Sequence, residues 1–148
     1  MDNQTDIGKY INKLYNRLRR NFWKEREQFG LTATQGNILS YILLESETTK
    51  LYQKDIEKEF DLRPSTATEL LQALEKKALI KRINDEKDGR YKILHATQKA
   101  QSLRESLQAA IHAKEATLTK GISMQELERF MRTAEKMLWN LEQLEEEN

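Results

Sequence analysis

Apolar residues near the start of the sequence recur every three or four positions, the spacing of one face of an amphipathic helix. This stripe consists of Ile7, Ile11, Leu14, Leu18 and Phe22. It predicts a helix from about Thr5 to about Gln28, which Phe29-Gly30 ends. The next residues, Thr32-Ala-Thr-Gln35, have the form of a capping box, in which a threonine oxygen and a glutamine side chain bond free amides at a helix start. A second helix is therefore expected, with apolar residues at Ile38, Leu39, Ile42 and Leu43.

Two shorter helices are predicted in the middle of the chain. Tyr52 to Phe60 forms a third helix of barely two turns, with Ile56 facing inward. Pro64 is well placed as the first residue of a fourth helix, because its missing amide hydrogen has no intrahelical partner at that position. This fourth helix is expected to run to Lys77, with a buried stripe of Ala67, Leu70, Leu71 and Leu74.

A β-hairpin is predicted directly after the fourth helix. Leu79–Ile83 and Arg90–His95 alternate apolar and polar residues, which is the pattern of half-buried strands. The charged stretch Asn84–Gly89 lies between them and forms the tip. No other part of the sequence predicts a sheet.

The last third of the sequence predicts two long helices. Thr97 caps a fifth helix that runs to about Leu118, and Lys120-Gly121 interrupts it. Ser123-Met-Gln-Glu126 is a second capping box and starts a final helix with a nearly heptad apolar stripe.

The order of elements over residues 32–96 is helix, short helix, helix and hairpin, which is the order of a winged helix-turn-helix. We therefore expect a mainly α fold with a two-stranded β-wing, in a single domain over residues 1–148. The helices over residues 5–28 and 97–147 carry more apolar surface than a compact core of this size covers. We expect them to form a helical dimerisation region that intertwines with a second copy of the chain.

The composition excludes several classes of site and of function. The chain has no cysteine, which excludes disulfides, thiolate metal sites and thiol-based sensing. No apolar run approaches the roughly 18 residues of a membrane span, so we expect a cytoplasmic protein with no membrane partner. The net charge is only +1, so any interaction with nucleic acid depends on where the charges lie.

No catalytic pattern is present in the sequence. It has no nucleophile paired with a base, no phosphate-binding glycine loop and no zincin motif, so we predict that the protein is not an enzyme. His112 with Glu105 or Glu115 is the nearest approach to a metal site, but these residue types are far more often ordinary surface groups. We predict no metal and no cofactor.

Several segments resemble the MarR family (multiple-antibiotic-resistance regulators). The strongest match is Thr66–Ile80 followed by Arg82 and Asp88-Gly-Arg90. Leu31–Gln35, Tyr52–Ile56 and Ala96–Ala100 are also similar. The resemblance implies a triangular dimer held by the terminal helices, a recognition helix that begins at Pro64, and a wing whose tip enters the minor groove. Members often repress their own and neighbouring genes, and they commonly lose DNA affinity when they bind a small, often aromatic or anionic, molecule.

The resemblance also implies which residues contact DNA. They are Arg63, Pro64, Ser65, Thr66, Thr68 and Glu69 at the recognition helix, with Asp88 and Arg90 on the wing. In this set Arg90 is the wing contact and Asp88 orients it. Glu69 departs from the family, which often has arginine there; a carboxylate repels phosphates but accepts a hydrogen bond from the cytosine amino group. Ala96 and Ala100 also depart, replacing the usual leucine and glycine.

The sequence thus predicts a homodimeric transcriptional repressor that binds double-stranded DNA at palindromic operators and is relieved by a small-molecule effector, with no ligand-binding residue assigned. The alternative is a winged-helix protein-interaction module without direct DNA binding, which the near-neutral charge and Glu69 favour. A ligand-binding protein without a DNA role is a third possibility. For Asp88 and Arg90, the competing interpretation is an ordinary exposed salt bridge.

Overall fold

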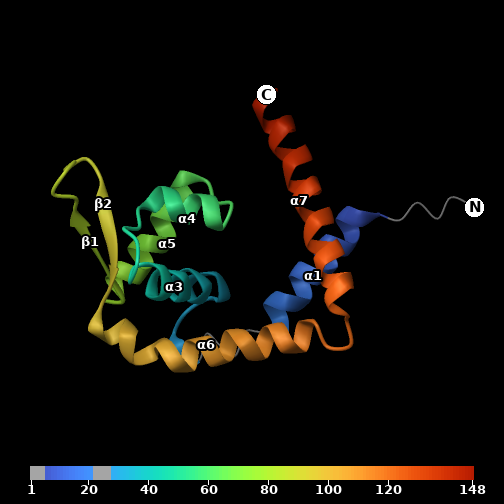
Figure 1. Cartoon of the computed structure of the whole chain (residues 1–148), viewed down its shortest axis with the longest axis horizontal. Coiled ribbons are helices and arrows are strands. Elements are labelled where there is room, and N and C mark those ends of the chain that lie inside the picture. The colour runs from blue at the N-terminus through green and yellow to red at the C-terminus, as the bar shows by residue number, and fades with distance from the viewer. Residues whose placement is uncertain (1–5, 22–27) are drawn as a thin grey trace, which may run out of the picture. The chain divides into compact units, whose positions relative to one another are not determined.

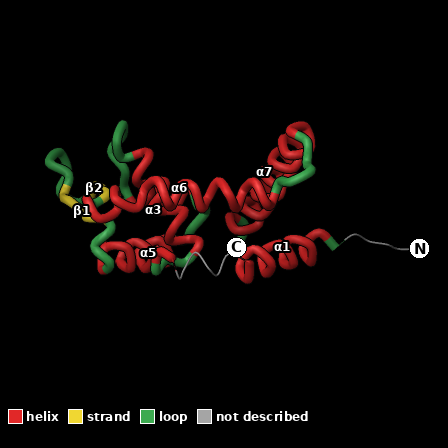
Figure 2. Tube along the Cα trace, turned by 90° about the horizontal axis from the view of Figure 1, so that it is seen from below, coloured by secondary structure: helices red, strands yellow, loops and turns green. Residues whose placement is uncertain are grey.

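The computed structural model describes residues 6–21 and 28–148. In chain order its elements are α1 (Ile7–Asn21), α3 (Ala33–Glu45), α4 (Gln53–Glu59), α5 (Pro64–Lys76), β1 (Ile80–Asn84), β2 (Lys92–Ala96), α6 (Gln98–Leu118) and α7 (Met124–Glu146) (Figure 1). The predicted fold class is confirmed: the chain is mainly helical with a two-stranded antiparallel wing. Figure 2 shows that strand structure in the described ranges is confined to this hairpin.

Most predicted bounds agree with the structure to within one or two residues. The first predicted helix agrees over Ile7–Asn21, whereas residue 5 and residues 22–27 lie outside the described residues. The chain divides into two compact units, one ending at Ile111 and one from His112 to Asn148, and the boundary falls within α6.

Helix starts follow local side-chain chemistry. At α3, the Thr32 hydroxyl accepts from the Gln35 N–H at 3.2 Å, and the Gln35 side chain accepts from the Thr32 N–H at 3.1 Å. The same reciprocal pair joins Ser123 and Glu126 at the start of α7. Thr97 accepts from the Ala100 N–H at 3.2 Å and so caps α6. All three predicted caps are present, because each satisfies backbone amides that the helix itself leaves without partners.

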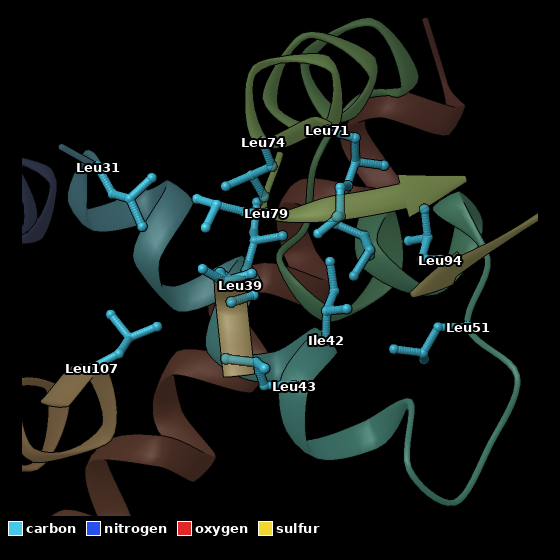
Figure 3. Packing of buried hydrophobic residues seen from close by; sticks show 14 residues of the cluster. Leu31, Leu39, Ile42, Leu43, Leu51, Leu71, Leu74, Leu79, Leu94 and Leu107 are labelled. Atoms are coloured by element: carbon cyan, nitrogen blue, oxygen red, sulfur yellow. The ribbon is translucent and has the colours of Figure 1, made fainter. Parts of the chain in front are cut away.

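One hydrophobic core lies in the first unit. It collects buried side chains from every element between α3 and the first half of α6, together with residues of the connecting segments (Figure 3). Its members are Leu31, Ile38, Leu39, Ile42, Leu43, Leu51, Ile56, Leu71, Leu74, Leu79, Ile80, Leu94, Ala100 and Leu107. We call residues 32–96, which supply most of this core, the winged lobe.

The predicted second strand is corrected at its start. It begins at Lys92 and not at Arg90, and its register pairs Ile80 with Ala96 and Asn84 with Lys92. Arg90 lies in a turn instead, closed by a 3.0 Å hydrogen bond from the Tyr91 N–H to the Asp88 carbonyl. Tyr91 therefore ends the tip, because its carbonyl accepts from the Asp85 N–H at 2.9 Å across the base of the loop.

Helices α1 and α7, which we call the outer helices, differ from the winged lobe in the burial of their side chains. Neither α1 nor α7 has a buried residue. Large apolar side chains are exposed along both, namely Ile7, Tyr10, Ile11, Leu14 and Tyr15 on α1 and Met124, Phe130, Met131, Leu138, Trp139, Leu141 and Leu144 on α7. Across the described residues, no helix is long and apolar enough to cross a bilayer.

Candidate nucleic-acid interface

The face of α5 opposite the core is exposed. Ala67, Leu71 and Leu74 are buried. Because a helix turns by about 100° per residue, this stripe directs the intervening residues to the opposite side. The exposed residues include Arg63, Ser65, Thr66, Glu69 and Gln72. The predicted recognition helix therefore exposes most of the side chains that were assigned to it.

The start of α5 has no side-chain cap. Arg63 occupies the N-cap position with extended backbone, and a guanidinium cannot accept a hydrogen bond from a helix amide. Pro64 follows as the first helical residue and has no N–H to satisfy. The next amides, together with the positive end of the helix dipole, suit an anion such as a phosphate oxygen.

The Thr68 side chain, predicted to contact DNA, is hydrogen-bonded within the protein. Its hydroxyl donates to the Pro64 carbonyl at 2.8 Å and accepts from the Gln53 side-chain amide at 2.9 Å. The same Gln53 nitrogen donates to the Pro64 carbonyl at 3.2 Å. Gln53 is the first residue of α4, so this network joins the two helices of the helix-turn-helix. Sequence reasoning missed Gln53, although its position at a helix start in the motif was a usable signal.

Arg90 is held at the tip of the wing by Asp88. Its Nε and one terminal nitrogen donate to the two carboxylate oxygens at 3.0 and 2.8 Å, and its backbone N–H donates to the same carboxylate at 3.2 Å. These hydrogen bonds lower the pKa of Asp88 and raise the pKa of Arg90. The Arg90 side chain is still 82% exposed, and a guanidinium has five N–H donors, so three remain for another partner.

The base of the wing is anchored to the helix-turn-helix by Tyr52 and Asp85. The Tyr52 hydroxyl donates to the Asp85 carboxylate at 2.6 Å. The other carboxylate oxygen accepts from the Lys87 N–H at 3.0 Å and lies 3.7 Å from the Lys50 ammonium. The Tyr52 hydrogen bond, followed by the Lys87 amide, holds the pKa of Asp85 below its ordinary value, and the same bond to Asp85 raises the pKa of Tyr52.

Further contacts fix the hairpin in place. The Leu94 N–H donates to the Leu51 carbonyl at 2.8 Å, directly beside Tyr52. The rings of Tyr52 and Tyr91 meet edge to face, with centroids 6.1 Å apart. Arg82 on β1 donates through two nitrogens to the Glu75 carboxylate on α5, both at 3.1 Å, which lowers the pKa of Glu75. The wing is thus bonded to α5 and to the residues directly before α4, and it lies beside these helices in Figure 1.

The structure places the sequence-predicted residues in two groups. Arg63, Pro64, Ser65, Thr66, Thr68 and Glu69 lie together on the first turns of α5, and Asp88 and Arg90 lie at the wing tip. Among the described residues, no hydrogen bond or ion pair links one group to the other. Each group offers free donors, from Arg63 in one and Arg90 in the other, which is chemistry suited to phosphate and base-edge acceptors.

Other candidate sites are weaker. No group of three or more His, Asp or Glu within residues 6–21 and 28–148 is arranged to hold a metal ion. A depression of about 270 Å³ lies between the turn at residues 46–50 and β2, but its lining side chains are mostly exposed. Aromatic side chains are also candidates for contact with an effector: Tyr41 packs edge to face on Phe60, Tyr10 and Trp139 are exposed, and Trp23 lies outside the described residues.

Comparisons with known proteins agree with this geometry. A model of the MarR family matches residues 29–90. No curated protein matches the chain. The S. aureus MepR–DNA complex is 28% identical, covers 95% of this chain and 99% of its own, and superimposes with a TM-score of 0.82. The transcription regulator MarR from Oenococcus oeni PSU-1 is 29% identical, with coverage of 90% and 98% and a TM-score of 0.80.

A further solved structure, S. aureus MepR in its DNA-binding conformation, is 29% identical, with coverage of 91% and 98% and a TM-score of 0.79. The family match covers the helix-turn-helix and the wing tip, and the solved structures extend the likeness over nearly the whole chain. Residues 29–90 therefore match the MarR family, and nearly the whole chain has the fold of solved MarR-type winged-helix transcriptional regulators.

Proposed function

We propose that this protein is a homodimeric repressor that binds palindromic operator DNA through α5 and the wing and is released by a small-molecule effector. One observation carries the DNA-binding part. A single unit combines an uncapped, exposed α5 start with an exposed Arg90 that Asp88 already orients. Members of the family are transcription regulators and not enzymes, in agreement with the prediction from the sequence.

The α5 contacts follow from the shape of B-DNA. The major groove accommodates an α-helix, and its base edges present hydrogen-bonding groups that side chains distinguish. Arg63, Ser65 and Thr66 on the first turn are exposed and contribute donors to phosphates or base edges. The related MepR has been solved with DNA, which supports transfer of this role to the matching helix here.

The wing contact follows from charge and reach. Arg90 has three unused N–H donors, and Lys87 lies close by in the sequence. We assign it to the minor groove, where a positive side chain meets the negative potential of the groove. Asp88 fixes the guanidinium in one orientation and takes no direct part in contact.

The dimer is proposed from the apolar faces of the outer helices. The exposed apolar side chains of α1 and α7 recur at helical spacing, as the residues of an interface do. Two copies related by a two-fold axis present two winged lobes to half-sites about one helical turn, roughly 34–36 Å, apart. We therefore assign residues 5–28 and 97–147 to dimerisation and residues 32–96 to reading DNA.

Effector control is supported by the likeness to the MarR family alone, and no pocket residue is assigned to it. A screen of aromatic and anionic metabolites tests it through two readouts, the melting temperature of the protein and its affinity for the operator. A bound effector raises the melting temperature by mass action and changes DNA affinity. The protein lacks an effector of these classes if every compound leaves both readouts unchanged.

The deciding experiment is selection of random duplex DNA by the purified protein, followed by titration of the enriched site at two salt concentrations. We expect a palindrome whose affinity falls steeply with salt, because each neutralised phosphate releases counterions. Arg90→Ala should weaken binding about tenfold across sequences and reduce the salt slope by about one per protomer. Arg90→Lys keeps the charge but loses the paired hydrogen bonds with Asp88. Its DNA affinity should lie between those of the wild type and Arg90→Ala.

Two results would contradict the proposal. Equal affinity of the wild type and Arg90→Ala would remove the wing assignment. No enriched sequence even at low salt would favour the alternative, a winged helix that holds a partner protein through the face carrying Glu69.

A further inference from the structure

Hydrogen bonds inside the helix-turn-helix restrict what the middle of α5 offers to DNA. Both amide hydrogens of Gln53 have partners, since the side-chain nitrogen donates to the Thr68 hydroxyl at 2.9 Å and to the Pro64 carbonyl at 3.2 Å. The orientation of this amide is fixed by chemistry, because the Pro64 carbonyl is only an acceptor and requires the nitrogen. Gln53 is left with its carbonyl oxygen, to which no donor bonds in the described part of the chain.

Thr68 is restricted in the same way. A hydroxyl has one hydrogen to donate, and that of Thr68 goes to the Pro64 carbonyl at 2.8 Å. The Gln53 amide occupies one of its two lone pairs. Thr68 therefore retains a single acceptor position and no donor, although a threonine is normally able to play both parts.

Glu69 is the third residue of this region whose side chain offers only hydrogen-bond acceptors to a partner. It is exposed and follows Thr68 directly on α5, and its side chain has no hydrogen bond or ion pair with any described residue. An ionised carboxylate only accepts hydrogen bonds. Gln53, Thr68 and Glu69 thus contribute acceptors only, whereas Arg63, one and a half turns earlier, contributes donors only.

The major groove offers few partners for such a group. The exocyclic amino groups of cytosine and adenine are its only strong donors, while guanine and thymine present acceptors there. Adenine also carries the N7 acceptor beside its amino group, and a carboxylate facing that edge meets a lone pair. Cytosine has no acceptor in this groove and is the base that fits.

We propose that Gln53, Thr68 and Glu69 form an acceptor-only patch that selects a cytosine amino group at one position of each operator half-site. This inference rests on the proposed DNA-binding function and adds to it the chemistry of one base pair. Glu69 makes the contact, and the Gln53–Thr68 bonds act as positioning interactions that withhold donors from the same region.

The test is selection of random duplexes by the wild type and by Glu69→Gln, with Glu128→Gln as the control. Glu128 is an exposed residue of α7, so its variant removes the same charge outside the winged lobe. Glutamine adds a donor beside its acceptor and so matches the N6 and N7 atoms of adenine. We expect the wild type to enrich one C·G pair per half-site at least about fivefold over other pairs. In Glu69→Gln, adenine should replace that cytosine on the same strand while other positions stay unchanged.

A second variant tests the positioning bonds. Thr68→Val keeps the side-chain shape, removes the hydroxyl and frees one Gln53 N–H to donate to DNA. We expect the preference for cytosine to fall at the same position, because bases that present acceptors become acceptable there. A Thr68→Val profile identical to the wild type would overturn the positioning role.

Three negative results of these selections would have different meanings. If the wild type and Glu69→Gln enrich the same palindrome with the same base at every position, the acceptor patch is refuted and DNA binding stands. If Glu128→Gln shifts the profile as Glu69→Gln does, the effect is one of net charge and the patch is again refuted. If the wild type enriches no sequence, the proposed function fails and this inference fails with it.

Discussion

The winged lobe and the outer helices carry similar apolar stripes but use them differently. In the lobe, stripes on α3, α4 and α5 meet in one core, where Ile42, Ile56 and Leu74 are fully buried. On α1 and α7 no residue is buried, and Leu138 and Trp139 are 46% and 60% exposed. The same periodicity in the sequence therefore has two meanings. It determines the fold where the chain covers its own stripe, and it indicates a partner where the chain does not.

The largest expected effect is a loss of stability at Leu43 of α3, with the adjacent Leu44 as its control. Leu43 is fully buried in the core, whereas Leu44 is 45% exposed. Leu43→Ala should lower the free energy of unfolding by about 2–5 kcal/mol, because it removes buried methyl groups and leaves a cavity. Leu44→Ala should change it by less than about 1 kcal/mol. Urea unfolding of both variants measures the difference, and equal losses would mean that Leu44 is covered in the assembled protein.

The next effect concerns α7. Leu138→Lys places a charge on the apolar stripe, and burial of that charge in a dimer interface should raise the dimer dissociation constant more than about tenfold. Asn140→Lys adds the same charge about 200° away around the helix and should leave assembly unchanged. Sedimentation over a range of protein concentrations separates the two. If Leu138→Lys remains as dimeric as Asn140→Lys, this face of α7 does not form the interface.

A smaller effect is expected at the start of α3. Thr32→Ala removes the cap that the Gln35 amide uses and should lower the free energy of unfolding by about 1 kcal/mol. Thr34, two residues further on, is exposed, and its side chain makes no hydrogen bond to the described residues. Thr34→Ala should be neutral or slightly stabilising, since alanine favours helix more than threonine does. Thermal melting of the pair tests whether the local cap contributes beside the core.

The smallest expected effect is a pH dependence of stability that arises from the hydrogen bond between Tyr52 and Asp85, which we call the wing anchor. Tyr52→Phe removes the hydrogen bond that lowers the pKa of Asp85. A lowered folded-state pKa stabilises the fold above the ordinary aspartate value of about 3.9 and is lost as pH falls through the folded value. The urea midpoint of Tyr52→Phe should therefore lie slightly below that of the wild type at pH 7, and the gap should close in acid.

Tyr91→Phe is the matched control for the wing anchor. The Tyr91 hydroxyl makes no hydrogen bond within the described ranges, although its ring packs on Tyr52. We expect no change in the midpoint and no change in its pH dependence. A gap between the wild type and Tyr52→Phe that persists unchanged at pH 3 would show that the carboxylate is not the group through which Tyr52 acts.

Local chemistry made much of the fold predictable. The capping boxes at Thr32 and Ser123 and the proline at position 64 act within four residues, so the sequence displays them directly. Long-range bonds were not predictable in this way. Tyr52 and Asp85 are 33 residues apart, and no local pattern indicates that a tyrosine at a helix start bonds a carboxylate in the wing.

The candidate site was predictable in position but not in chemistry. The exposed side of α5 follows from helical periodicity, so Arg63, Ser65 and Glu69 could be assigned from spacing. Thr68 was expected to be a free contact, yet its hydroxyl bonds Pro64 and Gln53, because the packing of α4 against α5 brings those groups together. Arg90 was expected at the start of a strand and lies in a turn, since the Tyr91 amide bonds the Asp88 carbonyl.

The pairing of Arg90 with Asp88 also bears on the timing of DNA recognition. A long side chain that is already ordered loses little conformational entropy when it enters a groove, and this favours a long-lived complex. The neighbouring carboxylate also cancels part of the positive field that would draw the wing toward DNA from a distance, and this slows encounter. A wing built in this way exchanges speed of association for residence time on DNA.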